Sequence, residues 1–292
     1  KVIQKQARKF KVKNIIIKDN LSFNKIKNKK ISKSINIYNN FSCFEKIFKK
    51  KKIDYVMSSI SGLNGLEPTL KVIKYTKIIA IANKESIICG WNLINNYLKK
   101  YNTKFIPVDS EHFSIWSLVD KNELSNVDKI YITASGGPFL KTSKSKLRSI
   151  RPIDAIKHPT WNMGKKISVD SSNLMNKVFE IIEASRIFNL KLNKFNVIIH
   201  PKSYLHSIVK FNNGTAKLLI HDTNMEIPIF NSIFKNQTKD YKKNSINFSY
   251  LNNLDLKSPN RNKFKNLKIL KSIPDNISLF ETVLVSANDE LV

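Results

Sequence analysis

Short β-branched runs separated by longer segments constrain the fold of this chain more than any other feature. The segments between the runs are long enough to carry helices, as EPTLKVIKY at Glu67 to Tyr75 illustrates. Strands that alternate with helices predict a parallel sheet of α/β type. The runs are Val12 to Asp19, Ile53 to Ile60, Thr76 to Ala82, Thr103 to Val108 and Asp128 to Ala134.

Polar motifs stand directly behind three of these predicted strands. They are NKES at Asn83 to Ser86, DSEH at Asp109 to His112 and SGGP at Ser135 to Pro138. Ligands of open α/β sheets bind at the carboxyl ends of the strands. The three motifs therefore predict a ligand site at that edge, although a Gly-Gly turn is also common as a plain turn.

A second region of different character begins near Arg151. It contains a predicted helix at 172–188, then a strand at 195–201 and a hairpin at 206–220 that folds at Asn213-Gly214. Residues 236–266 are polar with little periodicity, and we expect a loop there. We therefore predict two domains, an α/β domain at 1–150 and an α+β domain at 151–292.

The predicted helix at 172–188 carries a polar stripe beside its apolar residues. The stripe comprises Asn173, Asn176, Lys177, Glu180 and Glu183, within roughly 120° of the helix circumference. From these residues alone, a solvated face and a ligand-facing surface both remain open.

The segment before this helix, His158 to Ser172, combines Pro, Trp, Met and Gly in irregular surroundings, as a lid over a ligand does. We expect Ser171 or Ser172 to cap the helix, whose N-terminal N–H groups would then face a phosphate.

Two carboxylates, Asp109 and Glu111, lie two residues apart at the end of a predicted strand, where alternate side chains share a face. This pair alone also fits a simple surface turn. Together with Glu180 it gives three carboxylates, an oxygen set suited to Mg²⁺ or Mn²⁺.

The formal charge of +29 raises the question of nucleic acid, because clustered Lys and Arg bind phosphates. Arginine, which reads bases best, occurs only at positions 8, 148, 151, 186 and 261. We interpret the lysine-rich stretches, 25–34 and 49–52, as solvated surface and expect no nucleic-acid partner. The bias toward Lys, Asn and Ile resembles that of an AT-rich genome.

The sequence also bears on the compartment. It has no run of about 18 uncharged apolar residues and no apolar signal core at its start, so we expect a soluble protein with no membrane partner. Only Cys43 and Cys89 are present, too few for a disulfide framework, which favours a reducing compartment.

Taken in order, the motifs resemble those of the 1-deoxy-D-xylulose 5-phosphate reductoisomerase family over nearly the whole chain. The long block HPTWNMGKKISVDSSNLMNK, from His158 to Lys177, is the most specific. The others are IANKES (81–86), PVDSEH (107–112), ASGGPF (134–139), VIIHPKSYLHSIVKFNNGT (197–215) and SANDEL (286–291).

The resemblance implies roles for individual residues. Asp109, Glu111 and Glu180 would ligate Mg²⁺ or Mn²⁺, with Co²⁺ as a further possibility, and Asn83, Glu85 and Gly164 would touch NADPH. Lys84, Glu111 and His158 are the expected catalytic residues. Substrate contacts are expected from Lys84, Ser110, Glu111, Ser135, His158, Trp161, Ser171, Asn176, Lys177 and Glu180.

The family also implies a reaction, in which 1-deoxy-D-xylulose 5-phosphate rearranges and is reduced by NADPH to 2-C-methyl-D-erythritol 4-phosphate for isoprenoid synthesis. The fold expected is a Rossmann-like NADPH-binding domain followed by the catalytic domain, in a homodimer. The usual glycine-rich nucleotide loop has no counterpart in this chain, and we expect the C-terminal helical domain to be missing as well.

Two alternatives stay open beside that expectation. One is a truncated or decayed relative that binds metal and sugar phosphate without reducing it, and the other is a basic nucleic-acid-binding protein. We expect a bacterial cytoplasmic origin, with a plastid as the second possibility.

Overall fold

The computed structural model describes residues 2–27, 35–49, 51–143, 145–234, 239–241, 245–274 and 278–292. Parts of the predicted lysine-rich surface (28–34 and 50) and of the predicted loop (236–238 and 242–244) lie outside these residues. Within the described ranges, no helix combines the length and the apolar character needed to cross a bilayer.

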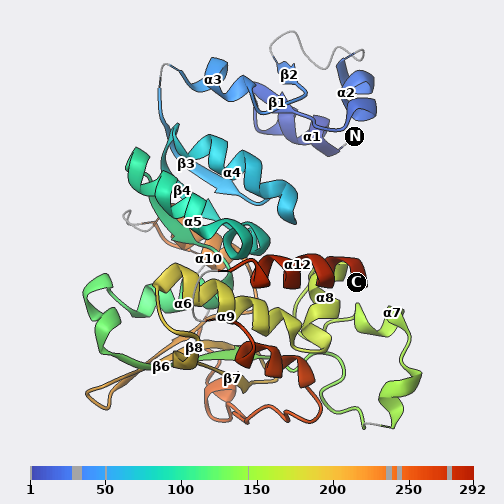
Figure 1. Ribbon diagram of the computed structural model, residues 1–292, viewed down its shortest axis with the longest axis vertical. Coiled ribbons are helices and arrows are strands. Elements are labelled where there is room, and N and C mark those ends of the chain that lie inside the picture. The colour runs from blue at the N-terminus through green and yellow to red at the C-terminus, as the bar shows by residue number, and fades with distance from the viewer. Residues whose placement is uncertain are drawn as a thin grey trace.

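The N-terminal unit is a small two-stranded parallel sheet with its own core. Ile15 pairs with Ile37, and Ala7, Ile15 and Ile17 are buried together. The unit stands apart from the rest of the chain at the top of Figure 1. Its elements are α1 (Val2–Lys9), β1 (Asn14–Ile16), α2 (Asn20–Lys27), β2 (Asn36–Tyr38) and α3 (Cys43–Phe48).

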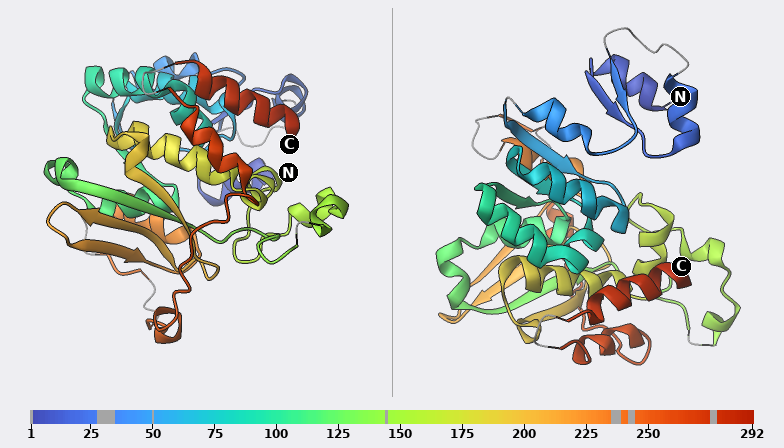
Figure 2. Two further views of the ribbon diagram at one scale, coloured as in Figure 1. Left: turned by 60° about the horizontal axis from the view of Figure 1, so that its bottom comes forward. Right: turned by 45° about the horizontal axis from the view of Figure 1, so that its top comes forward.

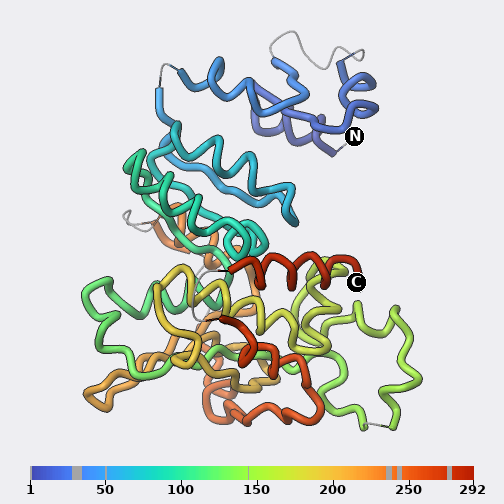
Figure 3. The backbone as a smooth tube through the Cα atoms, viewed as in Figure 1, coloured from blue at the N-terminus to red at the C-terminus, as the bar shows by residue number. Residues whose placement is uncertain are grey.

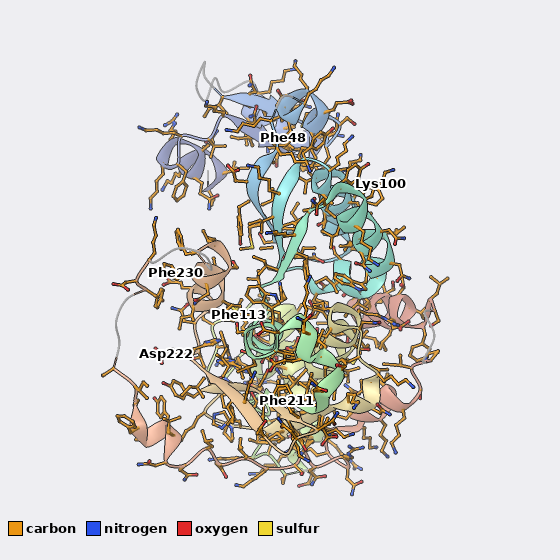
Figure 4. The ribbon with its side chains drawn as sticks, turned by 90° about the vertical axis from the view of Figure 1, so that its left-hand side faces the viewer. Phe48, Lys100, Phe113, Phe211, Asp222 and Phe230 are labelled. Atoms are coloured by element: carbon orange, nitrogen blue, oxygen red, sulfur yellow. The ribbon has the colours of Figure 1, made fainter. Side chains whose placement is uncertain are left out.

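The central sheet is parallel, in the order β3-β4-β5, and both of its faces are covered. Ile79 and Ile81 pack against α4 and α5, whereas Ala80 and Ile106 pack against the segment that contains α10. Figure 4 shows α5 near Lys100 and α10 near Phe230 on opposite sides of the strands. Burial on both faces explains why these strands read as nearly continuous apolar runs. The elements are β3 (Ile53–Ser58), α4 (Leu66–Ile73), β4 (Thr76–Ile81), α5 (Lys84–Tyr101), β5 (Lys104–Pro107) and α10 (Glu226–Phe234).

The third sheet is mixed, in the order β7-β6-β8-β9, with β6 parallel to β7 and antiparallel to β8. Helix α9 covers it, because Ile181 packs with Ile130, Ile132 and Val209. Figure 2 shows α9 between this sheet and the helices above it. The elements are β6 (Val127–Ala134), α9 (Met175–Phe188), β7 (Phe195–Ile199), β8 (Leu205–Phe211) and β9 (Ala216–Ile220).

The predicted strands are confirmed, but not their membership of one parallel sheet. The run at 12–19 forms β1 of the small N-terminal sheet, and the run at 128–134 forms β6 of the mixed sheet. The hairpin at Gly214, whose φ is 86°, supplies the antiparallel neighbours of that sheet. The division of the chain near residue 150 stays a prediction; β6 pairs with strands that follow this position.

Further α-helices complete the described fold. The C-terminal helix α12 packs along α5 and lies beside α8, as the backbone trace in Figure 3 makes clear. Among the described residues of the region expected to be loop at 236–266, the short helix α11 interrupts the irregular backbone, and a 3-10 helix begins at Lys265. These elements are α6 (Ser110–Leu118), α7 (Pro152–Ala155), α8 (Lys165–Ser172), α11 (Phe248–Leu251) and α12 (Phe280–Leu291).

Candidate active site

The polar motifs behind β5 and β6 meet at one cavity, and the motif behind β4 lines a second cavity that adjoins it. A cavity of about 290 Å³ is lined by Asp109, Ser110 and Glu111 from the second motif and by Ser135 from the third. Other predicted site residues complete its wall, namely His158, Trp161, Ser171, Asn176, Lys177 and Glu180. The structure therefore gathers residues from widely separated parts of the sequence around one space.

Asp109 and Glu111 reach the cavity by a route that differs from the prediction. They do not alternate along a strand, because α6 begins at Ser110 and Asp109 is its N-cap. The Asp109 Oδ1 atom accepts a hydrogen bond from the Glu111 N–H at 3.2 Å. Asp109 therefore caps the free N–H groups at the start of α6, and this cap brings the two side chains together.

Three carboxylates meet in this cavity. Asp109, Glu111 and Glu180 each offer an oxygen, and these oxygens lie within 4.8 Å of one another. Ser110 Oγ donates a hydrogen bond to Glu111 Oε2. Oxygen donors at this spacing fit a divalent cation such as Mg²⁺ or Mn²⁺.

Two lysines balance the carboxylates. Lys177 Nζ lies 2.6 Å from Glu111 Oε1 and 2.6 Å from Glu180 Oε2. Lys84 Nζ lies 3.6 Å from Asp109 Oδ2 and 3.6 Å from Glu180 Oε1. Lys84 also donates to Asn176 Oδ1 at 2.6 Å. The three carboxylates therefore belong to a buried network of alternating charge rather than to an acidic patch.

The two glutamates of this network differ in their titration. Burial and the neighbouring Glu111 raise the pKa of Glu180 to about 8, against the opposing effect of Lys177. Burial alone would raise the pKa of Glu111, but Lys177 and His206 hold it well below its usual range. Glu111 is thus ionised at neutral pH, and a divalent cation would favour the ionised form of Glu180 as well.

Two residues outside the predicted set, His112 and Glu183, support these carboxylates from behind. His112 Nε2 lies 2.8 Å from the carbonyl oxygen of Glu180, and His112 Nδ1 lies 3.4 Å from Glu183 Oε2 and 3.5 Å from Asp109 Oδ1. Burial raises the pKa of Glu183 to about 7. The sequence held a signal for both, because His112 belongs to the DSEH motif and Glu183 to the polar stripe.

The predicted lid segment is irregular between residues 157 and 164. Its His158 Nε2 lies 2.9 Å from Ser135 Oγ, and its Nδ1 accepts a hydrogen bond from the Trp161 N–H at 3.0 Å. Burial lowers the pKa of His158 to about 4, and Lys177 adds to this. The Trp161 ring meets His206 edge-on at 6.0 Å, so His206 is a cavity residue that sequence reasoning missed.

The expectation that Ser171 or Ser172 caps the long helix is wrong. Both serines lie in the last turn of α8, where Ser171 Oγ donates to the Ile167 carbonyl at 2.8 Å. A break follows at Leu174, whose φ is 62°, and α9 begins at Met175. The polar stripe therefore starts after a bend, with Asn176 in the first turn of α9.

A second cavity of about 370 Å³ adjoins the first and shares Ala82, Asp109 and Asn176 with it. All three residues expected to touch NADPH line it, together with Lys84: they are Asn83, Glu85 and Gly164. Asn83 caps α5 and donates to the Gly62 carbonyl at 2.8 Å, which fixes the loop behind β3. The second cavity therefore lies directly beside the carboxylate cluster, with Asp109 on the wall of both cavities.

Family models match this chain in two segments. The model for 1-deoxy-D-xylulose 5-phosphate reductoisomerase matches residues 1–90, and the model for the C-terminal domain of that enzyme matches residues 105–188.

Curated relatives carry the same name. A 1-deoxy-D-xylulose 5-phosphate reductoisomerase of Pelagibacter ubique is 58% identical over 297 residues, which is 100% of this chain and 76% of the relative. One from Clostridium kluyveri is 37% identical over 240 residues, covering 82% of this chain and 62% of the relative.

Solved structures agree with these relatives. The enzyme from Zymomonas mobilis in complex with NADPH matches with a TM-score of 0.82 at 30% identity, over 93% of this chain and 70% of that one. A reductoisomerase in complex with NADPH, fosmidomycin and magnesium matches with a TM-score of 0.84 at 28% identity, over 92% of this chain and 69% of that one. The chain belongs to the 1-deoxy-D-xylulose 5-phosphate reductoisomerase family.

Proposed function

We propose that this chain carries out the metal-dependent rearrangement of 1-deoxy-D-xylulose 5-phosphate and its reduction by NADPH to 2-C-methyl-D-erythritol 4-phosphate. The observation that carries the proposal is the set of three carboxylate oxygens within 4.8 Å in the first cavity, one of which, from Asp109, also lines the adjoining second cavity. The relatives' complexes with NADPH and magnesium support the choice of cofactors.

In this proposal Asp109, Glu111 and Glu180 hold a divalent cation, Mg²⁺ or Mn²⁺. Oxygen ligands suit these ions, and His112 fixes two of the carboxylate-bearing segments by contacts at 3.5 Å to Asp109 and 2.8 Å to the Glu180 carbonyl. When bound, the cation supplies Lewis-acid polarisation of the substrate's ketone and adjacent hydroxyl.

The substrate lies across the first cavity, with its phosphate toward Ser135, Ser171, Asn176 and Lys177. Lys177 is the charged member of this set, and its ammonium group also contacts Glu111 and Glu180. Phosphate contacts of this kind supply remote binding energy that orients the reacting carbons.

The hydroxyl-bearing end of the substrate meets Lys84, Ser110 and Glu111. Lys84 is buried, and Asp109 and Glu180 outweigh burial in raising its pKa, so its ammonium group stays protonated. A fixed cation in a water-poor cavity stabilises negative charge that develops on a substrate oxygen. His158 and Trp161 close over the substrate from the lid and exclude water.

Asn83, Glu85 and Gly164, which line the second cavity, would hold NADPH, which when bound would supply the hydride. We propose that residues 1–150 form the nucleotide-binding domain and 151–292 the catalytic domain, although Asp109 and Glu111 of the first domain line the catalytic cavity and Gly164 of the second lines the nucleotide cavity. His158 acts from the lid beside Ser135. We further propose a homodimer in the cytoplasm of a bacterium, in line with the bacterial relatives.

The test is NADPH oxidation, followed by absorbance, with 1-deoxy-D-xylulose 5-phosphate and Mn²⁺. The chain is compared with a form extended to the length of its Pelagibacter relative, with and without a chelator. Chelator-sensitive turnover in either form supports the proposal. If both forms bind Mn²⁺ but neither oxidises NADPH, the alternative of a binding-only relative replaces it.

A further inference from the structure

The SANDEL motif near the end of the chain has no part in the function proposed above, yet its side chains reach the lid helix. Asn288 and Asp289 lie on α12, and Asn288 is only 9% exposed. Asn288 Nδ2 donates to Asp170 Oδ1 of α8 at 2.9 Å. An amide and a carboxylate that are both buried are costly unless they bind each other, so this contact fixes the two helices against one another.

The second oxygen of Asp170 is used as well. Asp170 Oδ2 accepts a hydrogen bond from Lys166 Nζ, one turn earlier on α8, at 2.9 Å. Lys166 Nζ also lies 3.2 Å from Asp289 Oδ1 on α12 and 4.0 Å from Glu85 Oε1 on α5. One ammonium group therefore ties α8 to both α12 and α5.

Helix α8 is held at its other end by close packing. Gly137 of the SGGP turn has a φ of 68°, and a Cβ atom there would meet the Ser171 carbonyl oxygen at 2.6 Å. With that turn at its C-terminal end and α12 along its side, α8 has little freedom to shift. The side chains it sends toward ligands depend on this placement.

Residues of α8 and its N-cap line both cavities. Gly164, the N-cap, and Lys165, Lys166 and Asp170 line the second cavity, whereas Ser171 lines the first. Movement of α8 away from α5 would widen the second cavity, because Glu85 forms part of the opposite wall. A small displacement of the cavity wall lowers the affinity for a bound cofactor, even when no residue that contacts the cofactor has been replaced.

We infer that Asn288 and Asp289 are positioning residues, which act through Asp170 and Lys166 to fix α8 and so set the width of the cavity for the nicotinamide dinucleotide. This inference rests on the proposed function, since NADPH is the ligand whose binding it affects. In this inference, the SANDEL motif acts by maintaining the affinity for the cofactor.

The decisive variant is Asn288→Asp in the extended protein, which places a second carboxylate beside Asp170 at unchanged size. The dissociation constant of NADPH, measured by its fluorescence without substrate, should rise about tenfold, and the KM for NADPH should rise with it while kcat stays within about threefold. Asn288→Ala, which removes the donor without adding charge, should give a smaller rise of the same kind.

A second substitution that restores the hydrogen bond distinguishes a positioning role of Asn288 from a general loss of structure. In the double variant Asp170→Asn with Asn288→Asp, the amide and the carboxylate exchange places, one N–H···O bond can re-form, and Lys166 keeps Asp289. The dissociation constant should return to within about threefold of the wild type. Glu290→Gln, an exposed change on the same helix, is the matched control and should leave NADPH binding unaltered.

Thermal unfolding is recorded for every variant. Wild-type affinity in a folded Asn288→Asp protein, or a folded double variant no better than the single one, would overturn the inference. If Asn288→Asp does not fold, Asn288→Ala decides by the same measurement. A wild-type protein that fails to bind NADPH counts against the proposed function instead, so the two failures are distinguishable.

Discussion

The lysines of the candidate site and those of the surface form ion pairs of nearly equal length in very different surroundings. Lys177 lies 2.6 Å from Glu111, with 9% of its side chain exposed, whereas Lys77 lies 2.7 Å from Asp54, with 59% exposed. Exposed pairs are screened by water and contribute little to stability. A buried pair leaves an uncompensated charge when one partner is removed. Burial, rather than the length of the ion pair, therefore distinguishes the lysines whose loss destabilises the fold from the exposed lysines that mainly contribute to the net charge of +29.

The largest expected effect comes from replacing a carboxylate of the buried network. Glu180→Gln removes a proposed metal ligand but keeps the size of the side chain. Chelator-sensitive turnover in the extended protein should fall by about 10³-fold or more, with little change in the circular dichroism spectrum. The steady-state NADPH assay and a Mn²⁺ titration measure this. Unchanged activity would remove Glu180 from the metal site.

The next effect compares the same substitution at the two kinds of lysine. Lys177→Met leaves Glu111 and Glu180 without their shared partner, and the free energy of unfolding should fall by about 3 kcal/mol. Denaturant titration of the chelated protein measures it. Added Mn²⁺ should recover part of the loss, since a cation that binds only the folded state stabilises it. A loss no larger than that of Lys77→Met would break the comparison.

A smaller effect concerns the pH dependence of stability, because the pKa shifts of the buried and the exposed carboxylate have opposite signs. Burial raises the pKa of Glu183 from 4.5 to about 7, so its contribution to stability is complete below pH 4.5 and is lost as pH rises through 7. The hydrogen bond from Lys77 instead lowers the pKa of Asp54. Relative to Glu183→Gln, the chelated wild type should lose up to about 1 kcal/mol per pH unit across that interval.

Chemical denaturation of the wild type and of Glu183→Gln at a series of pH values checks this slope. Parallel curves for the two proteins would mean that Glu183 stays protonated throughout or is already ionised at acid pH.

The smallest expected effect is at the surface. Lys77→Met breaks the exposed contact with Asp54, and the melting temperature should move by less than about 1 °C. Scanning calorimetry at low and at high salt measures it. A shift of several degrees would mean that exposed pairs of this chain are stronger than their setting suggests.

Local pattern was sufficient to predict the strands but not their partners. The alternation of apolar runs located β3, β4 and β5 to within a few residues, because burial on both faces leaves its mark on each strand separately. Sheet membership depends on contacts between distant segments, and β6 joined the later hairpin for that reason. The capping prediction failed because the chain bends at Leu174, which has a left-handed backbone conformation. Glycine is the usual residue in that conformation, so a leucine gave no sign of the bend in the sequence.

The candidate site was largely accessible from the sequence because its residues stand in ordered motifs. The polar stripe put Asn176, Lys177 and Glu180 on one face, and the structure places all three on the cavity wall. His206 was missed, since a lone histidine in a predicted strand resembles a core residue. Its place on the wall follows from tertiary packing against Trp161.

The left-handed conformation of Leu174 fixes how the end of α8 is placed relative to the start of α9. Its φ of 62° costs roughly 1 kcal/mol for a residue with a Cβ atom, and its side chain is 1% exposed, so the bend between α8 and α9 is held by packing. Ser171 stands on one side of the bend and Glu180 on the other. The packed bend therefore holds Ser171, one of the proposed phosphate contacts, in a fixed position relative to Asn176, Lys177 and Glu180 on α9.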